Sequence, residues 1–274
     1  MALKIAINGF GRIGRCVTRI ASTRDDVDVV AINDMANVDM MLHLLKYDSV
    51  HGPFAKTIEK IDDKNVVIDG KNVRVFNESD PKNLKFGDCG VDMVLECTGI
   101  FLTQELAQAH LDNGVPKVLF SAPAKDSFTP TFVMGVNHNE YAGQKIVSNA
   151  SCTTNCLAPI ASILDEAFGI EKGLMTTIHS YTNDQNILDV KHETDKRRAR
   201  AGAINMIPTT TGAARALSLV LPKLLGKLDG TSIRVPTPDV SMVDLTVHVT
   251  KKTTKEEVVA LFNEMARTKF EGLL

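Results

Sequence analysis

The chain has 274 residues, of which 44% are hydrophobic and 23% are charged, which is typical of a globular protein with one large or two ordinary domains. Its formal net charge is −2, so composition gives no electrostatic basis for non-specific binding to nucleic acid or to a membrane surface. No stretch approaches the roughly 18–20 apolar residues of a membrane span.

The cysteines indicate a reducing compartment. The chain contains 5 of them, an odd number, scattered along the sequence, which argues against a disulfide framework. Cys152 and Cys156 lack the spacing of a zinc-binding pair, and no second pair accompanies them. We therefore expect a cytoplasmic protein without a metal site.

The first 34 residues follow the order strand, glycines, helix, strand, acid. The apolar run Lys4–Ile7 predicts a buried strand, and Val27–Ile32 predicts a second strand that ends beside Asp34. Between the strands lie the glycines of a GxGxxG pattern: Gly9, Gly11 and Gly14. Apolar residues at helical spacing then predict a helix with one apolar face: Ile13, Val17 and Ile20.

This order predicts a dinucleotide-binding unit. The glycines permit a tight turn and let a pyrophosphate approach the amino terminus of the helix. Asp34 would accept hydrogen bonds from the ribose hydroxyls, and its charge would repel a 2′-phosphate, so NAD is favoured over NADP. The alternative interpretation is a purely structural turn between two strands.

Further strands and helices follow up to about residue 150. The sequence predicts the following elements: a hairpin over Val66–Phe76 with an Asp69–Gly70 turn, strands over Val91–Cys97, Pro116–Phe120 and Lys145–Val147, and a helix over Gln104–Asp112. In a doubly wound sheet, ligands lie beyond the carboxyl ends of such strands. Thr98, Gly99 and Ser121 are therefore candidate cofactor contacts, although each could equally be an ordinary turn residue.

Cys152 stands between the strand Lys145–Val147 and a predicted helix, Cys156–Leu164. Its neighbours include several good N-cap residues, so Cys152 is expected at or near a helix amino terminus. The helix dipole and unpaired N–H groups favour a thiolate there, and a thiolate is the form of cysteine that acts as a nucleophile. The alternative is a small buried cysteine beside a capped helix.

The remaining residues predict a second, mixed set of elements. These are a strand Gly173–His179 that presents His179 at its end, a polar and basic stretch 191–205, a hydroxyl-rich anion-binding loop 207–214, a helix 217–225, a turn 228–230, strands 232–236 and 240–249, and a helix 255–267. His179 could serve as the general base for Cys152 or be an ordinary surface histidine.

Four stretches together resemble phosphorylating glyceraldehyde-3-phosphate dehydrogenases, in the same order and through essentially the whole chain: Asn8–Arg15, Ala150–Asn155, His179–Thr182 and Thr209–Ala214. The resemblance implies an α/β fold with a Rossmann-type NAD-binding domain at 1–150, followed at 151–274 by an α+β catalytic domain with a mixed or antiparallel sheet. It also implies a glycolytic, cytoplasmic homotetramer in which the stretch 191–205 lines subunit contacts.

The resemblance implies specific chemistry. Cys152 would attack the aldehyde of glyceraldehyde 3-phosphate, with His179 as the base. Hydride transfer to NAD would leave a thioester, which inorganic phosphate would convert to 1,3-bisphosphoglycerate. The implied phosphate-binding residues are Ser151, Thr153, Thr182, Arg198, Thr211, Gly212 and Arg234. The implied cofactor-binding residues are Gly9, Gly11, Arg12, Ile13, Gly14, Asp34, Ser79, Thr98, Gly99 and Ser121.

The sequence departs from the family pattern in two places. Family members continue for several dozen residues past a position like Leu274, so a C-terminally truncated chain is expected, either as a fragment or in fact. Ser79 occupies a position near the adenine where the family often has Arg. Two alternatives accompany the main interpretation. One is an erythrose-4-phosphate dehydrogenase, a sister activity with the same cysteine, histidine and fold, and the other, if the truncation is real, is a non-catalytic NAD-binding fragment.

Overall fold

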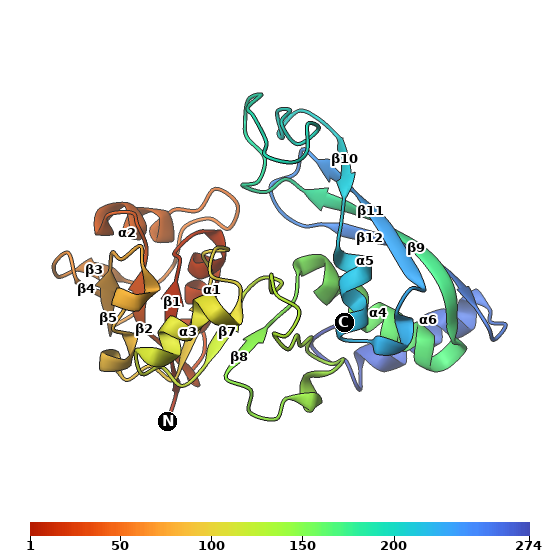
Figure 1. Ribbon diagram of the computed structural model, residues 1–274, viewed down its shortest axis with the longest axis horizontal. Coiled ribbons are helices and arrows are strands. Elements are labelled where there is room, and N and C mark those ends of the chain that lie inside the picture. Colours follow the sequence, from red (N-terminus) through yellow and green to blue (C-terminus); the bar gives the residue numbers. More distant parts are fainter. The chain divides into compact units, whose positions relative to one another are not determined.

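A computed structural model describes residues 1–274 as two compact units (Figure 1). The first unit comprises Met1–Thr131 and Ala142–Ala150, and the second comprises Phe132–Tyr141 and Ser151–Leu274. The segment Phe132–Tyr141 thus groups with the second unit, whereas the sequence placed it in the first domain. One reason is a close contact: a Cβ atom at Gly135 would lie 2.8 Å from the ring of Phe270, which is fully buried.

The first unit contains an eight-stranded sheet in the order β3-β4-β5-β2-β1-β6-β7-β8. The strands are β1 (Leu3–Asn8), β2 (Val27–Asn33), β3 (Ile58–Lys60), β4 (Asn65–Ile68), β5 (Lys71–Phe76), β6 (Met93–Glu96), β7 (Val118–Phe120) and β8 (Ile146–Ser148). The six strands from β5 to β8 are parallel, and β3 and β4 extend the edge in antiparallel fashion. Strand order reverses between β1 and β6, so this is the doubly wound sheet that the sequence predicted.

Helices cover both faces of this sheet. They are α1 (Arg12–Ala21), α2 (Val38–Lys46) and α3 (Gln104–Asp112). Ile5 and Ile7 of β1 join one core, which contains buried residues of α1 and α2, while Ala6 joins the core that contains Ala107 of α3. Because successive side chains of a strand point to opposite faces, β1 is buried on both sides, as its continuous apolar run indicated.

The predicted apolar face of α1 is wrong. Ile13 and Ile20 are 51% and 61% exposed, and the helix instead buries Gly14, Thr18 and Ala21. The buried stripe has small residues because the helix lies very close to β1 and to the turn after it. A Cβ atom at Gly14 would lie 2.9 Å from the side chain of Ile7 and 2.3 Å from the carbonyl oxygen of Gly9.

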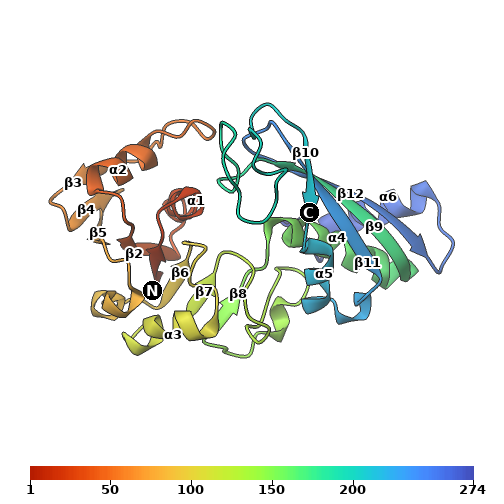
Figure 2. The same ribbon diagram turned by 45° about the horizontal axis from the view of Figure 1, so that its top comes forward.

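The second unit contains a four-stranded sheet in the order β10-β11-β9-β12. Its elements are α4 (Cys152–Phe168), β9 (Ile170–Ser180), β10 (Ile207–Thr210), α5 (Ala213–Ala216), β11 (Leu228–Val235), β12 (Met242–Val249) and α6 (Lys255–Ala266). β9 and β11 are parallel, and the two outer pairs are antiparallel, so the sheet is mixed as expected. α4 and α5 pack along this sheet (Figures 1 and 2).

Three local predictions in this unit are wrong. The predicted helix 217–225 consists of two short 3₁₀ turns, Leu217–Leu219 and Pro222–Leu224. The predicted turn 228–230 is the start of β11, where Gly230 leaves no room for a side chain because a Cβ atom would lie 2.6 Å from the carbonyl oxygen of Met175. The predicted loop 207–214 begins with four strand residues, which pair with β11.

None of the helices is both long and apolar enough to cross a membrane.

Candidate active site

Cys152 is the first residue of α4, so the helix begins four residues earlier than the pattern of apolar residues indicated. Ser151 is the N-cap, and its hydroxyl accepts a hydrogen bond from the N–H of Thr154 at 3.0 Å. Ala150, just before the cap, has a positive φ of 58°, an uncommon conformation for a residue with a side chain. The Cys152 side chain is exposed, which excludes the alternative of a small buried cysteine.

His179 lies next to Cys152, with its Nε2 atom 3.4 Å from Sγ. Its Nδ1 atom is 2.7 Å from the carbonyl oxygen of Ser180, an acceptor only. The carbonyl oxygen only accepts and is nearer to Nδ1 than Nη1 of Arg234 is, at 3.3 Å, so Nδ1 carries a proton and donates to Ser180. Nε2 can then accept the thiol proton and, once protonated, donate to the thiolate. The end of β9 thus places Nε2 of His179 beside the thiol of Cys152, and the role of His179 as a base stays a prediction.

The pKa of Cys152 is lowered from 9.0 to about 7. The hydrogen bond with His179 is the largest cause, burial opposes it, and the charge of His179 and a hydrogen bond from Thr153 add to the lowering. Cys156, one helical turn further on, behaves in the opposite way, because burial and the nearby Cys152 raise its pKa. Only the first of the two thiols is therefore poised as a nucleophile near neutral pH.

Two predicted phosphate-binding residues meet beside this pair. Arg234 on β11 is opposite His179 on β9 in the parallel register. Its Nη1 atom donates to the carbonyl oxygen of Ser180 at 3.2 Å and to the hydroxyl of Thr182 at 3.1 Å. An arginine and a hydroxyl held together at the end of a strand suit a phosphate group.

The other predicted phosphate ligands lie on neighbouring elements. Thr153 follows the nucleophile on α4, with its hydroxyl 3.9 Å from the sulfur of Cys152. Thr211 and Gly212 precede α5, which packs against α4 and β11. Arg198 lies in the loop between β9 and β10, and its charge acts on Arg234. The elements that carry these residues are therefore neighbours in the second unit, and the phosphate-binding roles of the residues stay predictions.

The predicted cofactor residues of the first unit follow the carboxyl ends of parallel strands. Gly9 follows β1, Asp34 follows β2, and Ser121 follows β7. Thr98 and Gly99 come just after β6, where Gly99 has a φ of 76° and open space around it. This edge of a doubly wound sheet is where dinucleotides bind.

The glycine turn fits a pyrophosphate. Gly9 has a φ of 94°, and a Cβ atom there would lie 2.7 Å from the backbone nitrogen of Thr98. Gly11, the N-cap of α1, has no neighbouring atom within 4 Å of its Cβ position. The helix amino terminus therefore has a cradle that any larger residue would fill, as expected for close approach of an anion.

Asp34 does more than the sequence indicated. Its carboxylate accepts hydrogen bonds from the backbone N–H groups of Phe10 at 2.7 Å and Ala36 at 2.8 Å. Asp34 thus fixes the glycine turn to the end of β2. Two carboxylate oxygens offer about four acceptor positions, so ribose hydroxyls can still bind.

The remaining predicted cofactor residues are on the surface. Arg12 forms an ion pair with Asp48, Ile13 is 51% exposed, and Ser79 is exposed. None of these observations involves a cofactor, so the cofactor-binding roles of the three residues stay predictions.

Sequence reasoning missed a buried acid behind the cofactor edge. Glu96 is fully buried and accepts hydrogen bonds from the side chain of Asn8 at 2.7 Å and from the N–H of Thr98 at 2.9 Å. His110 lies 3.4 Å from the same carboxylate. The sequence signal that could have indicated it is the single acidic residue, Glu96, at the end of the otherwise apolar strand β6.

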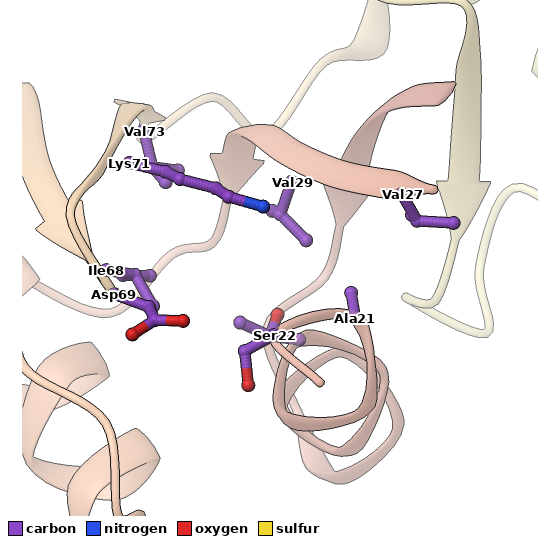
Figure 3. A pocket seen from close by; sticks show the side chains of 9 residues that line it. Ala21, Ser22, Val27, Val29, Ile68, Asp69, Lys71 and Val73 are labelled. Carbon is purple, nitrogen blue, oxygen red and sulfur yellow. The ribbon is translucent and has the colours of Figure 1, made fainter. Parts of the chain in front are cut away.

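A small cavity lies elsewhere in the first unit, between the end of α1 and the strands β2, β4 and β5 (Figure 3). Ser22 and Asp69 are on its walls, together with Val27 and Val29 from the start of β2. It is at the amino ends of the parallel strands, and no predicted cofactor or catalytic residue lines it.

These features are typical of an oxidoreductase: a doubly wound dinucleotide-binding unit together with a unit in which a cysteine thiol lies beside a histidine imidazole. Two family models match the chain, the glyceraldehyde 3-phosphate dehydrogenase NAD binding domain over residues 3–104 and the C-terminal domain over residues 151–274. The chain therefore belongs to the glyceraldehyde-3-phosphate dehydrogenase family, whose members are NAD-dependent.

Curated relatives agree over the full length of this chain. Glyceraldehyde-3-phosphate dehydrogenase of Priestia megaterium is 53% identical over 276 residues, which cover 100% of this chain and 82% of the relative. The protein of the same name from Geobacillus stearothermophilus is 53% identical with the same coverage. Glyceraldehyde-3-phosphate dehydrogenase A of Escherichia coli is 50% identical over 274 residues, again 100% of this chain and 82% of the relative.

Proposed function

We propose that the protein oxidises glyceraldehyde 3-phosphate to 1,3-bisphosphoglycerate, with NAD as the hydride acceptor and inorganic phosphate as the second substrate. The observation that carries this proposal is the Cys152–His179 pair, with 3.4 Å between Sγ and Nε2 and a cysteine pKa of about 7. The relatives described above are named glyceraldehyde-3-phosphate dehydrogenases, so the erythrose 4-phosphate and non-catalytic alternatives are not favoured.

The first step joins Cys152 to the substrate. The thiol proton moves to Nε2 of His179, and the sulfur attacks the aldehyde carbon. Nε2 then returns the proton to the former aldehyde oxygen, which gives a neutral thiohemiacetal and leaves His179 unprotonated on Nε2. The first N–H groups of α4 have no partner within the helix and favour the negative charge that develops on the oxygen.

Oxidation then gives a thioester. His179 accepts the hydroxyl proton of the thiohemiacetal as the aldehyde hydrogen leaves as hydride, for which bound NAD supplies the acceptor. The glycine turn and Asp34 would hold the cofactor. A phosphate oxygen next attacks the thioester carbonyl, the carbon–sulfur bond breaks, and the acyl phosphate leaves Cys152 as a thiolate.

Two phosphate groups must therefore be held at different distances from Cys152. Arg234 and Thr182 are proposed to hold the phosphate of the substrate, which fits their mutual hydrogen bond at 3.1 Å. Ser151, Thr153, Thr211 and Gly212 are proposed to hold inorganic phosphate, with Arg198 near both.

The protein is further proposed to be a cytoplasmic homotetramer. Several large apolar side chains of the loop between β9 and β10 are strongly exposed, among them Ile187 at 82%, Ile204 at 79% and Met206 at 75%. Exposed apolar side chains concentrated in one loop are typical of a surface that another subunit covers.

The test is formation of NADH by the purified chain with glyceraldehyde 3-phosphate and NAD, with and without inorganic phosphate. Sustained turnover is expected with phosphate, and a single burst equal to the amount of enzyme without it. Cys152→Ser should abolish both while NAD still binds. Turnover by Cys152→Ser would refute the assignment of the nucleophile.

A further inference from the structure

Arg198 sits in a closed ring of hydrogen bonds made by five side chains of the second unit. Its Nη1 atom donates to Asp184 at 2.9 Å, and its Nε atom donates to the hydroxyl of Thr209 at 2.9 Å. The same Thr209 hydroxyl also donates a hydrogen bond to the carboxylate of Asp195 at 2.7 Å. His192 completes the ring, with Nε2 3.2 Å from the carboxylate of Asp184.

The ring closes through the backbone. Nδ1 of His192 accepts hydrogen bonds from the N–H groups of Thr194 at 3.2 Å and Asp195 at 3.0 Å. The loop that carries four of the ring residues is thereby tied to Thr209 of β10, which is only 2% exposed.

Only one placement of the protons lets every hydrogen bond of the ring have one donor and one acceptor. The guanidinium only donates and both carboxylates only accept, so the Thr209 hydroxyl must donate to Asp195 and accept from Arg198. Two backbone N–H groups face Nδ1 of His192, so that nitrogen must be unprotonated and Nε2 must carry the proton. The ring therefore requires the neutral Nε2–H form of His192.

The charges around the ring agree with this arrangement. Burial raises the pKa of Asp184, but hydrogen bonds from His192 and Arg198 outweigh burial and the net pKa is lowered. The hydroxyl of Thr209 and the N–H of Arg197 lower the pKa of Asp195 to about 2. Both carboxylates are thus charged acceptors at neutral pH.

We propose that His192, Asp184, Asp195 and Thr209 are positioning residues that fix the guanidinium of Arg198 for phosphate binding. The ring engages Nε and Nη1 and makes no use of Nη2, which is left for a phosphate oxygen. An arginine side chain loses much rotational freedom on binding, so holding it in place beforehand removes part of that cost from the binding step. The proposal rests on the phosphate-binding role of Arg198 proposed above.

Two substitutions of His192 separate its contacts. In His192→Asn, a carbonyl oxygen replaces Nδ1 and still accepts from the backbone, but the side chain is too short to reach Asp184. In His192→Gln, the amide nitrogen can still donate to Asp184. His248→Asn is the matched control, because His248 pairs with Glu171 at 2.7 Å at the opposite end of β9.

The first readout is steady-state kinetics with varied inorganic phosphate. His192→Asn should raise KM for phosphate about tenfold to a hundredfold, the size of one charge-assisted hydrogen bond, with a smaller change in kcat at saturating phosphate. His192→Gln should recover most of this loss, and His248→Asn should match the unsubstituted protein. An unchanged KM for phosphate in His192→Asn would overturn the proposal.

A second pair of variants opens the ring at the other side. Thr209→Val removes the hydroxyl at nearly constant volume, and Thr209→Ser keeps it. Thr209→Val should weaken phosphate binding as His192→Asn does, and the double variant should be no worse than either one, because a ring needs only one break. Additive losses would contradict a closed ring, and this pair also decides the matter if His192→Asn does not fold.

Two measurements do not depend on catalysis. Nitrogen NMR of the folded chain should show His192 with a proton on Nε2 and an accepting Nδ1, and the opposite tautomer would overturn the proposal. Titration with inorganic phosphate alone should give dissociation constants that follow the KM values. If the dehydrogenase activity is absent while these constants change as expected, the proposed function fails and the positioning role stands.

Discussion

At the scale of single residues, the thiol of Cys152 combines two features that arise far apart in the sequence. The N-cap of α4 places the thiol at a helix amino terminus, and the end of β9 brings Nε2 of His179 to 3.4 Å. The first feature could be predicted from the residues around Cys152. The second could not, because no local pattern says which strand end lies beside which helix.

The lowered pKa of Cys152 predicts how its reactivity depends on pH. With a pKa of about 7, the thiolate predominates above pH 7 and is lost as the pH falls below it. The alkylation rate with iodoacetamide should therefore rise through a midpoint near pH 7. In His179→Asn the midpoint should move up toward the ordinary value of 9.0, because the largest lowering contact is gone. The same midpoint in both proteins would refute the role of His179.

Asp34 combines a structural and a selective role. Asp34→Asn keeps an oxygen that can accept from Phe10 but removes the negative charge. The ratio of NADP to NAD use should therefore rise, because a 2′-phosphate is no longer repelled. Competition binding with the two cofactors measures this ratio. If it does not change, the carboxylate serves only the glycine turn.

At the scale of elements, the glycine turn and α1 form one tightly packed unit. Gly14→Ala should lower the free energy of unfolding by about 1–3 kcal/mol, because the new methyl group would meet the carbonyl oxygen of Gly9. Gly11→Ala has open space and should change stability by less than about 1 kcal/mol, while NAD binding weakens.

Urea unfolding and NAD titration of the two variants check this prediction. The contrast between them is the test: equal losses of stability would mean that the two glycines have the same role, which contradicts the geometry.

Element order and strand ends could be predicted from the sequence because they depend on local patterns. The helix Gln104–Asp112 and the Asp69–Gly70 turn have the bounds that the sequence indicated. The errors arise where contacts between elements decide. Gly230 was predicted in a turn, but it lies in a strand against Met175. Ile13 was predicted on the buried face of α1, but it is exposed, because the side of α1 that packs most closely is the one that carries Gly14.

The same limit applies to charged side chains. The sequence showed only that Arg198 lies in a polar and basic stretch, and the family resemblance implied a phosphate-binding role for it. The structure surrounds Arg198 with Asp184 and Thr209, which are separated from it by 14 and 11 positions. The sequence alone does not identify such partners, because they meet only when the loop packs against β10.

At the scale of the whole molecule, the segment Phe132–Tyr141 belongs to the second unit although the chain returns afterwards to the first. Gly135→Ala should therefore destabilise the second unit by more than about 1 kcal/mol, from the positive φ of 81° and from the contact with Phe270. NAD binding by the first unit should be retained.

Gly143→Ala is the control for backbone strain alone, because Gly143 has a φ of 91° and open space at its Cβ position. Thermal unfolding of both variants measures the difference. If Gly143→Ala is as destabilised as Gly135→Ala, the contact with Phe270 contributes nothing.

The contact between Gly135 and Phe270 also sets an order of events during synthesis. The segment Phe132–Tyr141 leaves the ribosome together with the first unit, but its packing partner is made more than about a hundred residues later. At roughly 5–20 residues per second, the segment waits on the order of ten seconds. During that time the first sheet can form while the segment Phe132–Tyr141 still lacks its packing partner, so residues around Phe270 complete a contact that residues around Gly135 began.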